Sequence, residues 1–274
     1  MVCEMDELEP EIEQILEVIY RQYHYDFRAY SRSSLARRFD AACATLNCAN
    51  VRELQAKLED DAQFFARLLQ FLTVQVSELF RDPGFFLALR THIVPVLRTY
   101  PSLKIWIAGC STGEEVYSFA ILLREEGLLD RTMLYATDIN PESLRRAEAG
   151  VYPIDRVPAF SENYRAAGGK ASLANYYSAR YESVVFDRSL RKNTVFADHS
   201  LATDSVFAEV QVVSCRNVLI YFNHALQEHA LGLMKDALCR RGFLGLGARE
   251  TLQFSVHASA FTELIRQERW YQKC

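Results

Sequence analysis

Hydrophobic residues in the first eighty positions recur every three to four residues, which is the period of one helix face. The first such stripe is made of Ile12, Ile15, Leu16 and Ile19, and three more follow at about 35–46, 54–58 and 64–72. No glycine or proline interrupts residues 11–80. The pattern therefore predicts a small all-helical domain.

Short, β-rich apolar runs begin after residue 100 and alternate with amphipathic stretches. The runs are LKIWIAG (103–109), MLYATD (133–138), VQVVSC (210–215) and GFLGLGA (242–248). Apolar strands that alternate with helices are typical of a mostly parallel sheet covered on both faces. We therefore predict an α/β domain over 101–274, preceded by a helical domain over 1–84 and a bridging helix over 85–100.

The alternation breaks between Gly150 and about Asp198. Gly168-Gly169 is followed by strand-like runs near 176–186 and 191–197. Short runs of this kind bounded by turn residues favour antiparallel strands. We expect residues of about 165–198 to form a small antiparallel β insertion in the α/β domain.

Composition and charge narrow the classes of function. The 274 residues include 31 basic and 35 acidic ones, and the net charge of −4 argues against a nucleic-acid binder. Seven scattered cysteines without a CxxC pair fit reduced thiols, and the dispersed histidines show no HExxH, so we expect no metal. Because no apolar run approaches 18 residues, we expect a cytoplasmic protein without membrane insertion.

The stretch GCSTG at 109–113 admits two interpretations. It satisfies G-x-S-x-G, which in α/β-hydrolases exposes a nucleophilic serine, here Ser111. It is also a glycine turn between a strand and a helix, which is the usual cradle for a nucleotide-like cofactor. Asp204 and His257 could complete a hydrolase triad. The turn follows the first strand of its sheet, however, and no HGGG-like oxyanion segment precedes it, so the serine hydrolase is the weaker hypothesis.

Acidic residues around this turn favour one class of cofactor. Asp138 ends the second strand, where a carboxylate accepts hydrogen bonds from ribose hydroxyls, and its alternative role is to cap the helix from Pro141. The glycine spacing is not that of a dinucleotide site, and Glu114-Glu115 would repel a pyrophosphate. S-adenosylmethionine carries an ammonium and a sulfonium but no phosphate, so the acidic pair fits this methyl donor.

Five stretches together resemble the chemotaxis-receptor methyltransferases of the CheR type. They are TVQVSELFRDP (73–83), IWIAGCSTGEEVYS (105–118), ATDINPESLRRAEAGVY (136–152), SCRNVLIYF (214–222) and GFLGLGARETL (242–252). The resemblance implies a Rossmann-like methyltransferase domain behind an all-α N-terminal domain. It also implies transfer of a methyl group from S-adenosylmethionine to glutamate side chains of methyl-accepting chemoreceptors, whose cytoplasmic helical region would be the partner, with S-adenosylhomocysteine as product.

The resemblance also implies which residues of this chain occupy the positions of the family's site residues. Arg81 and Tyr221 are implied to lie nearest the transferring methyl group. The residues implied to bind the cofactor are Gln75, Ser77, Arg81, Gly109, Glu115, Asp138, Ser200, Leu201, Arg216 and Asn217. Ser77 stands where the family usually has Thr, and Ser200 where it has Asn. These departures leave open a second hypothesis, a non-catalytic module that binds S-adenosylmethionine and reports on it to a partner.

Positive charge gathers in the helical part of the chain. Residues 20–58 hold seven basic and three acidic side chains, a net charge of +4 in a chain whose total is −4. Because receptor methylation helices present glutamates, we predict that this basic face docks the receptor, with Arg37 and Arg38 as the contacts. Whether the β insertion also grips a receptor tail stays open.

Overall fold

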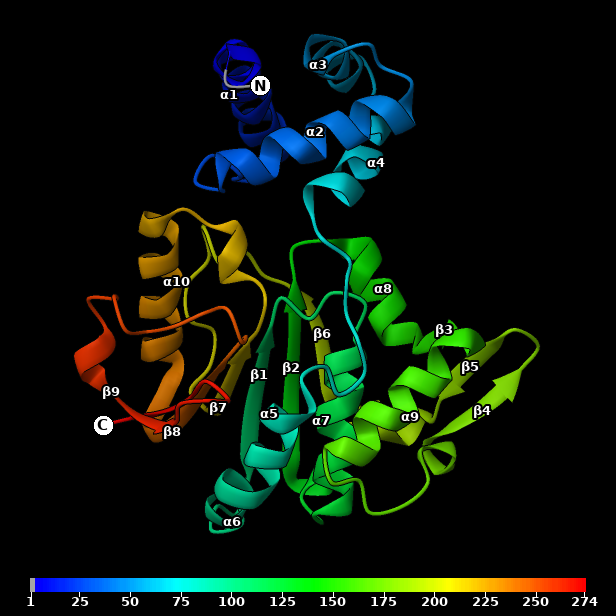
Figure 1. Cartoon of the computed structure of the whole chain (residues 1–274), viewed down its shortest axis with the longest axis vertical. Coiled ribbons are helices and arrows are strands. Elements are labelled where there is room, and N and C mark those ends of the chain that lie inside the picture. Colours follow the sequence, from blue (N-terminus) through cyan, green and yellow to red (C-terminus); the bar gives the residue numbers. More distant parts are fainter. Residues whose placement is uncertain (1–2) are drawn as a thin grey trace. The chain divides into compact units, whose positions relative to one another are not determined.

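The computed structural model describes residues 3–274, with side-chain surroundings for residues 9–61 and 63–274 (Figure 1). The chain divides into two compact units. The helical unit comprises residues 3–75 together with Tyr221–His229, and the α/β unit comprises Val76–Ile220 and Ala230–Cys274. The sequence placed the end of the helical domain at 84. The contacts place it at 75 and add a segment from the second half of the chain.

The helical unit contains the four helices that the hydrophobic periodicity predicts. They are α1 (Cys3–Tyr23), α2 (Arg32–Leu46), α3 (Val51–Asp60) and α4 (Ala62–Leu72). Ile15, Leu16 and Ile19 of α1 are fully buried, as their spacing predicts. Side-chain caps fix two of the helix starts: Asn50 accepts a hydrogen bond from the Glu53 amide and Asp61 from the Gln63 amide. No helix in residues 3–274 is both long and apolar enough to span a bilayer.

The α/β unit is built on a seven-stranded sheet in the order β6-β2-β1-β7-β8-β10-β9. The strands are β1 (Leu103–Ala108), β2 (Thr132–Asp138), β6 (Thr194–Asp198), β7 (Val210–Cys215), β8 (Leu238–Leu246), β9 (Phe261–Ile265) and β10 (Trp270–Lys273). The first five strands in the sheet order pair in parallel, and β10 runs antiparallel to both of its neighbours, β8 and β9. The strand order reverses at β1, and the carboxyl ends of β1, β2 and β7 therefore meet at one edge of the sheet.

Helices cover this sheet as the α/β prediction requires. They are α5 (Pro83–Ala88), α6 (Val94–Leu97), α7 (Glu114–Glu125), α8 (Pro141–Ala149), α9 (Val157–Ala166) and α10 (His224–Ala237). Every residue of α7 from Val116 to Leu123 is buried, so this helix lies inside the unit rather than on its surface. Since α7 starts directly after the glycine turn, its burial fixes the position of that turn.

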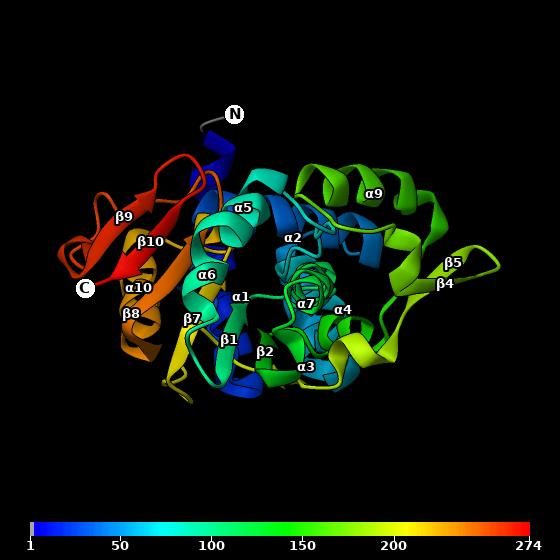
Figure 2. The same cartoon turned by 90° about the horizontal axis from the view of Figure 1, so that it is seen from below.

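A second, three-stranded antiparallel sheet has the order β3-β5-β4, from β3 (Val151–Pro153), β4 (Tyr177–Arg180) and β5 (Ser183–Phe186). It lies at the opposite end of the α/β unit from the β9–β10 hairpin (Figure 2). The predicted β insertion therefore exists, but its bounds differ from the prediction of 165–198. The prediction of an antiparallel strand at 191–197 is wrong. This run forms β6, which pairs in parallel with β2 at the edge of the main sheet.

The predicted bridging helix over 85–100 belongs to the α/β unit and is not a linker. It consists of α5, a π-helical turn at Leu89–Ile93, and α6. The Phe85 ring stacks on Trp270 of β10 at a centroid distance of 4.3 Å, and the Trp270 indole donates a hydrogen bond to the Phe85 carbonyl oxygen at 3.1 Å. These contacts anchor the segment that directly follows Arg81 and Asp82.

Candidate active site

The loop Val76–Asp82 enters the α/β unit and is fastened along its length. The Phe80 amide donates to Ser118 Oγ of α7 at 2.7 Å, and the Asn163 side chain donates to the Leu79 carbonyl oxygen at 3.1 Å. Phe80 and Asp82 both adopt left-handed backbone conformations, with φ of 50° and 54°. Non-glycine residues hold such conformations only where the surroundings enforce them. The loop is therefore a fixed element that presents Arg81.

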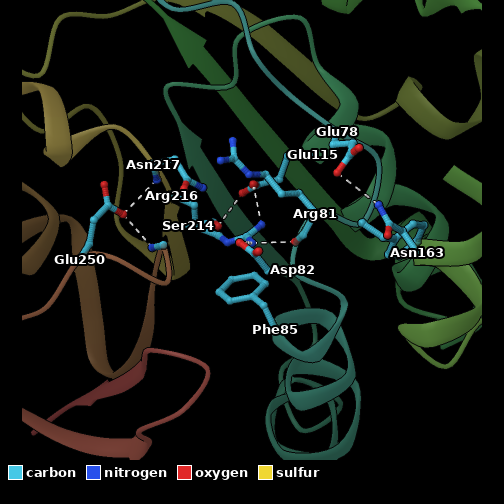
Figure 3. Close-up of polar contacts among 12 residues, drawn as sticks. Glu78, Arg81, Asp82, Phe85, Glu115, Asn163, Ser214, Arg216, Asn217 and Glu250 are labelled. Carbon is cyan, nitrogen blue, oxygen red and sulfur yellow. Dashed lines mark hydrogen bonds and ion pairs between the residues drawn. The ribbon is translucent and has the colours of Figure 1, made fainter. Parts of the chain in front are cut away.

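Arg216, directly after β7, joins this loop to the sheet (Figure 3). Its side chain is 1% exposed. Nη1 donates to Glu115 Oε2 at 2.9 Å, while Nη2 donates to Asp82 Oδ2 at 2.9 Å and to the Arg81 carbonyl oxygen at 2.7 Å. The guanidinium carbon lies 4.0 Å from the centroid of the Phe85 ring. A planar, permanently charged fork suits this role because it serves several acceptors at once.

Glu115 of α7 is paired within the same network. Its Oε1 accepts a hydrogen bond from Ser214 Oγ at 2.7 Å, and its Oε2 accepts from Arg216. The side chain keeps 14% exposure. The carboxylate thus remains accessible on one side while Ser214 and Arg216 fix its orientation.

Glu114, its neighbour, has a structural role instead. The side chain is buried, Oε1 pairs with Arg156 Nη1 at 2.6 Å, and Oε2 accepts from the Thr112 hydroxyl at 2.7 Å. Arg156 also donates to the Ser77 carbonyl oxygen. The expectation that both acidic residues of the pair attract a cationic cofactor is therefore wrong for Glu114, whose charge is neutralised by Arg156.

The glycine turn after β1 requires its two glycines. Gly109 has φ of 69°, and a Cβ there would lie 2.5 Å from a methyl group of Val218. Gly113 has φ of 92°, and a Cβ there would lie 2.6 Å from the Ala147 side chain. Between them Ser111 also adopts a left-handed conformation, with φ of 50°. The turn is therefore held in one shape by close packing against the tip of β7 and against α8.

Asp138 at the carboxyl end of β2 fastens this turn from the neighbouring strand. Its Oδ2 accepts from the Ser111 amide at 2.8 Å and its Oδ1 from the Asn140 amide at 2.9 Å. Burial raises the pKa of Asp138 above its ordinary value, although these amide bonds oppose the shift. Asn140, not Asp138, caps α8, because its side chain accepts from the Glu142 and Ser143 amides. The alternative capping role of Asp138 is therefore wrong.

Glu250 is a site residue that the sequence interpretation missed. Its buried carboxylate accepts hydrogen bonds from the amides of Asn217, Val218 and Gly247 at 2.7–2.9 Å and from Ile220 at 3.4 Å. Burial raises the pKa of Glu250, and the same amide bonds oppose the shift. Glu250 thus holds the segment that follows Arg216, including the left-handed Asn217. The signal was the glutamate in GARE, at the end of a run already matched to the family.

The remaining predicted site residues, cofactor-binding and catalytic, lie in two places. Ser200 and Leu201 follow β6, where Ser200 Oγ accepts from the Ala202 amide at 3.2 Å and Leu201 is buried. Gln75 and Tyr221 belong to the helical unit, and Gln75 is hydrogen-bonded to Gln70 of α4. The predicted set is therefore divided between the two units, with most of its members in the α/β unit.

The structure corrects one predicted docking residue. Arg38 is 7% exposed, its Nη1 donates to the Leu72 carbonyl oxygen, and its guanidinium lies 4.5 Å from the centroid of the Tyr221 ring. It faces the interior of the helical unit because Leu35, Phe39 and Ala42 on the same stripe are buried there. Arg38 is thus wrong as a surface contact, whereas Arg37 is exposed.

The unpaired polar atoms of the α/β unit fit S-adenosylmethionine. Among the buried polar atoms without a hydrogen-bond partner in the described residues, Ser111 Oγ and Arg216 Nε are the two that belong to the loops after β1 and β7. Buried polar groups normally have partners, so these two are suited to a polar ligand at the strand tips. Arg216 and Ser111 would face a carboxylate or hydroxyl, Glu115 an ammonium, and Asp138 the ribose hydroxyls. No group of three or more potential metal ligands occurs among the described residues.

The geometry does not support Ser111 as a nucleophile. An activated serine needs a base within hydrogen-bond reach of its oxygen. Ser111 Oγ has no such partner in the described part of the chain, and Asp204 instead accepts from the Ser200 amide at 2.9 Å. The G-x-S-x-G match is therefore a coincidence of spacing.

A parallel sheet with a glycine turn after its first strand and a carboxylate at the tip of the second is typical of Rossmann-like domains that bind a nucleoside-containing cofactor. Comparison with protein families agrees. The model "CheR methyltransferase, SAM binding domain" matches residues 75–267, and "CheR methyltransferase, all-alpha domain" matches residues 10–73. The chain belongs to the CheR family of S-adenosylmethionine-dependent methyltransferases.

Three relatives of this chain cover between 72% and 96% of it. The putative methyltransferase Cher3 of Pseudomonas putida is 56% identical over 263 residues, which cover 96% of each chain. A chemotaxis protein methyltransferase of Listeria innocua is 27% identical and covers 90% of this chain and 92% of its own. Chemotaxis protein methyltransferase 2 of Pseudomonas aeruginosa is 31% identical, covering 72% of this chain and 69% of its own.

The raised pKa of Asp138 predicts a pH-dependent affinity. An ionised carboxylate accepts two ribose hydroxyls, and protonation removes one acceptor, so S-adenosylhomocysteine affinity should fall as the pH decreases through that raised pKa. Asp138→Asn should bind about ten- to a hundredfold more weakly at neutral pH, since it loses a charged hydrogen-bond partner. Calorimetric titration between about pH 5 and 8 tests this. The same pH profile in Asp138→Asn would contradict the assignment.

Replacing Glu250 should loosen the segment after β7. Glu250→Gln keeps the size of the side chain but places an NH₂ group against backbone amides that need acceptors. We expect the free energy of unfolding to fall by about 1–3 kcal/mol, together with weaker S-adenosylhomocysteine binding. Urea denaturation and calorimetry measure the two effects. Glu263→Gln, at an exposed site in β9, is the control and should change neither.

Proposed function

We propose that this methyltransferase transfers the methyl group of S-adenosylmethionine to glutamate side chains of methyl-accepting chemoreceptors, forming glutamate methyl esters. The observation that carries the proposal is the fixed position of Arg81, whose carbonyl oxygen is held by the buried Arg216. The family membership and the names of the relatives, chemotaxis protein methyltransferases, support the substrate class.

The chemistry needs positioning more than activation. A glutamate with a pKa of about 4.3 is ionised at neutral pH, so the nucleophile arrives with the substrate and no general base is required. When bound, S-adenosylmethionine supplies an electrophilic methyl group: a carbon–oxygen bond forms to the glutamate as the carbon–sulfur bond breaks, leaving S-adenosylhomocysteine. Alignment of reactants in a fixed geometry lowers barriers by about 7–11 kcal/mol.

Arg81 is suited to orient the incoming carboxylate. The Arg81 side chain is half-buried. The one hydrogen bond that this side chain makes to another described residue is long, from Nη1 to the Val76 carbonyl oxygen at 3.4 Å. Most of its donors thus remain available for a planar acceptor. We assign Tyr221 to steady the same carboxylate or the sulfonium, through its hydroxyl or its ring face.

The helical unit fits a receptor-docking role through its basic residues, with Arg37 as the contact retained. Several neighbouring basic residues are engaged within the unit, since Arg28 pairs with Asp26 and Arg32 with Glu13. Arg37 is exposed and has no ion pair among the described residues. An acidic receptor helix is therefore the partner that this position fits best.

The test mixes the protein with radiolabelled S-adenosylmethionine and a chemoreceptor cytoplasmic fragment. Base-labile label on the receptor supports the proposal, because methyl esters hydrolyse in base. Cofactor binding without transfer would instead support the non-catalytic module, and absence of both binding and transfer would contradict the proposal.

Arg81→Ala should reduce kcat about a hundredfold or more, because the carboxylate loses its orienting donors. S-adenosylhomocysteine affinity should change less than kcat does. Ser111→Ala should leave most of the transfer, since Ser111 is not a nucleophile. The matched control is Arg145→Ala, an exposed arginine of α8. An Arg81→Ala enzyme with normal turnover would remove Arg81 from the catalytic assignment.

Reversing the charge of Arg37 tests docking. Arg37→Glu should raise KM for the receptor several-fold and leave kcat and S-adenosylhomocysteine affinity unchanged, because it acts on association alone. The increase should shrink as salt is added, since exposed charges are screened. Receptor kinetics identical to those of the unmodified enzyme at low salt would exclude this surface.

A further inference from the structure

Tyr221 is held by residues of the helical unit, although it lies far from them in the sequence. The Ser31 amide donates to the Tyr221 carbonyl oxygen at 2.8 Å, and the Asn223 amide donates to the Ala29 carbonyl oxygen at 2.9 Å. These bonds surround an isolated antiparallel bridge between Tyr30 and Phe222. The backbone on both sides of the bridge is therefore fixed to the segment that precedes α2.

The Tyr221 ring has its own partner in Arg38 of α2. The Arg38 guanidinium carbon lies 4.5 Å from the ring centroid, within the range of a cation–π contact. Arg38 is in turn held by the bond from its Nη1 to the carbonyl oxygen of Leu72, the last residue of α4. The guanidinium therefore connects the end of α4 to the face of the ring.

Burial of the Arg38 guanidinium removes a charge from water, which lowers the stability of the fold unless other contacts compensate. Its Nε and Nη2 are buried without hydrogen-bond partners among the described residues, and no carboxylate pairs with it there. Burial lowers the pKa of the guanidinium, as expected for a cation removed from water, and Tyr221 and Tyr30 oppose this shift only in part. A leucine or methionine at this place would avoid the desolvation cost. The contacts that offset this cost are the bond to Leu72 and the cation–π contact with the Tyr221 ring, which an apolar side chain cannot make.

We propose that Arg38 is a positioning residue that fixes the ring of Tyr221 for methyl transfer, an inference that rests on the proposed function. Arg38 acts through Tyr221, so its loss should lower kcat more than it raises KM. Arg37, one residue earlier and exposed, should show the opposite division.

The experiment compares Arg38→Gln and Arg38→Lys with a matched control in the same unit. Arg67→Gln is that control, because Arg67 also lies over an aromatic ring, Phe64, at 5.0 Å, but its side chain is 59% exposed. Arg38→Gln should lower kcat by about 2- to 30-fold, the range that a cation–π contact covers, and Arg38→Lys, which keeps a cation, should lower it less. KM for the receptor and the S-adenosylhomocysteine Kd should stay within about twofold, and Arg67→Gln should change none of these.

A double-mutant cycle separates positioning from a general loss of structure. If Arg38 acts through the ring, Arg38→Gln should have little further effect on kcat once Tyr221 is already Ala. A structural role would lower kcat by the same factor in both backgrounds and would overturn the inference. If Arg38→Gln does not fold, the same cycle is measured with Arg38→Lys, which keeps a cation at this position.

The environment of the ring can be measured directly by fluorine NMR with 3-fluorotyrosine placed at position 221. Its fluorine resonance should shift toward the value of the free amino acid in Arg38→Gln and stay in place in Arg67→Gln, with or without cofactor. An unchanged resonance would overturn the inference. Absence of methyl transfer by the unmodified chain would instead contradict the proposed function, while the fluorine measurement would still report on the Arg38 contact.

Discussion

The site depends on one buried guanidinium. Arg216 connects three elements that are distant in the sequence: the loop that carries Arg81, the start of α7 at Glu115, and the end of β7. Removing one partner of such a buried pair typically costs about 3–5 kcal/mol, because it leaves an uncompensated charge. Arg216 is therefore the constraint through which the positions of the proposed cofactor and substrate residues become interdependent.

Backbone strain gathers at the same place. Positive φ angles occur at four non-glycine residues of the site: Phe80, Asp82, Ser111 and Asn217. Each of them is hydrogen-bonded to a buried or partly buried side chain, which for Asp82 is Arg216. Ser118 accepts from the Phe80 amide, Asp138 from Ser111, and Glu250 from Asn217. Left-handed conformations of non-glycine residues cost about 1–3 kcal/mol each and persist only where the surroundings enforce them. The side chains that bond these amides thus hold the strand tips in one geometry.

The sequence predicted the elements better than their assembly. Apolar periodicity located the four N-terminal helices and the parallel strands, because burial imposes that period locally. It misassigned β6, since strand direction depends on partners distant in the chain. Motif matching supplied Arg216, Asp138 and Glu115 as candidates. Glu250 was missed although GARE lies in a matched stretch, because a glutamate that accepts backbone amides has no fixed spacing to its partners, and Arg156 lies outside the matched stretches. Arg38 was taken for a surface residue on charge alone.

The missed residues share a physical role. Glu250 and Arg38 are buried charged side chains, Arg156 is partly buried with 35% of its side chain exposed, and all three bond to backbone groups or rings. Charged groups rarely occupy such places without a compensating interaction. In a reaction whose substrate brings an ionised nucleophile, the protein gains most from holding donors and rings in place. A buried charge bonded to backbone groups restricts orientation more strictly than apolar packing does, because hydrogen bonds are directional. The residues that fasten this site are therefore as much part of its mechanism as those that contact the ligand.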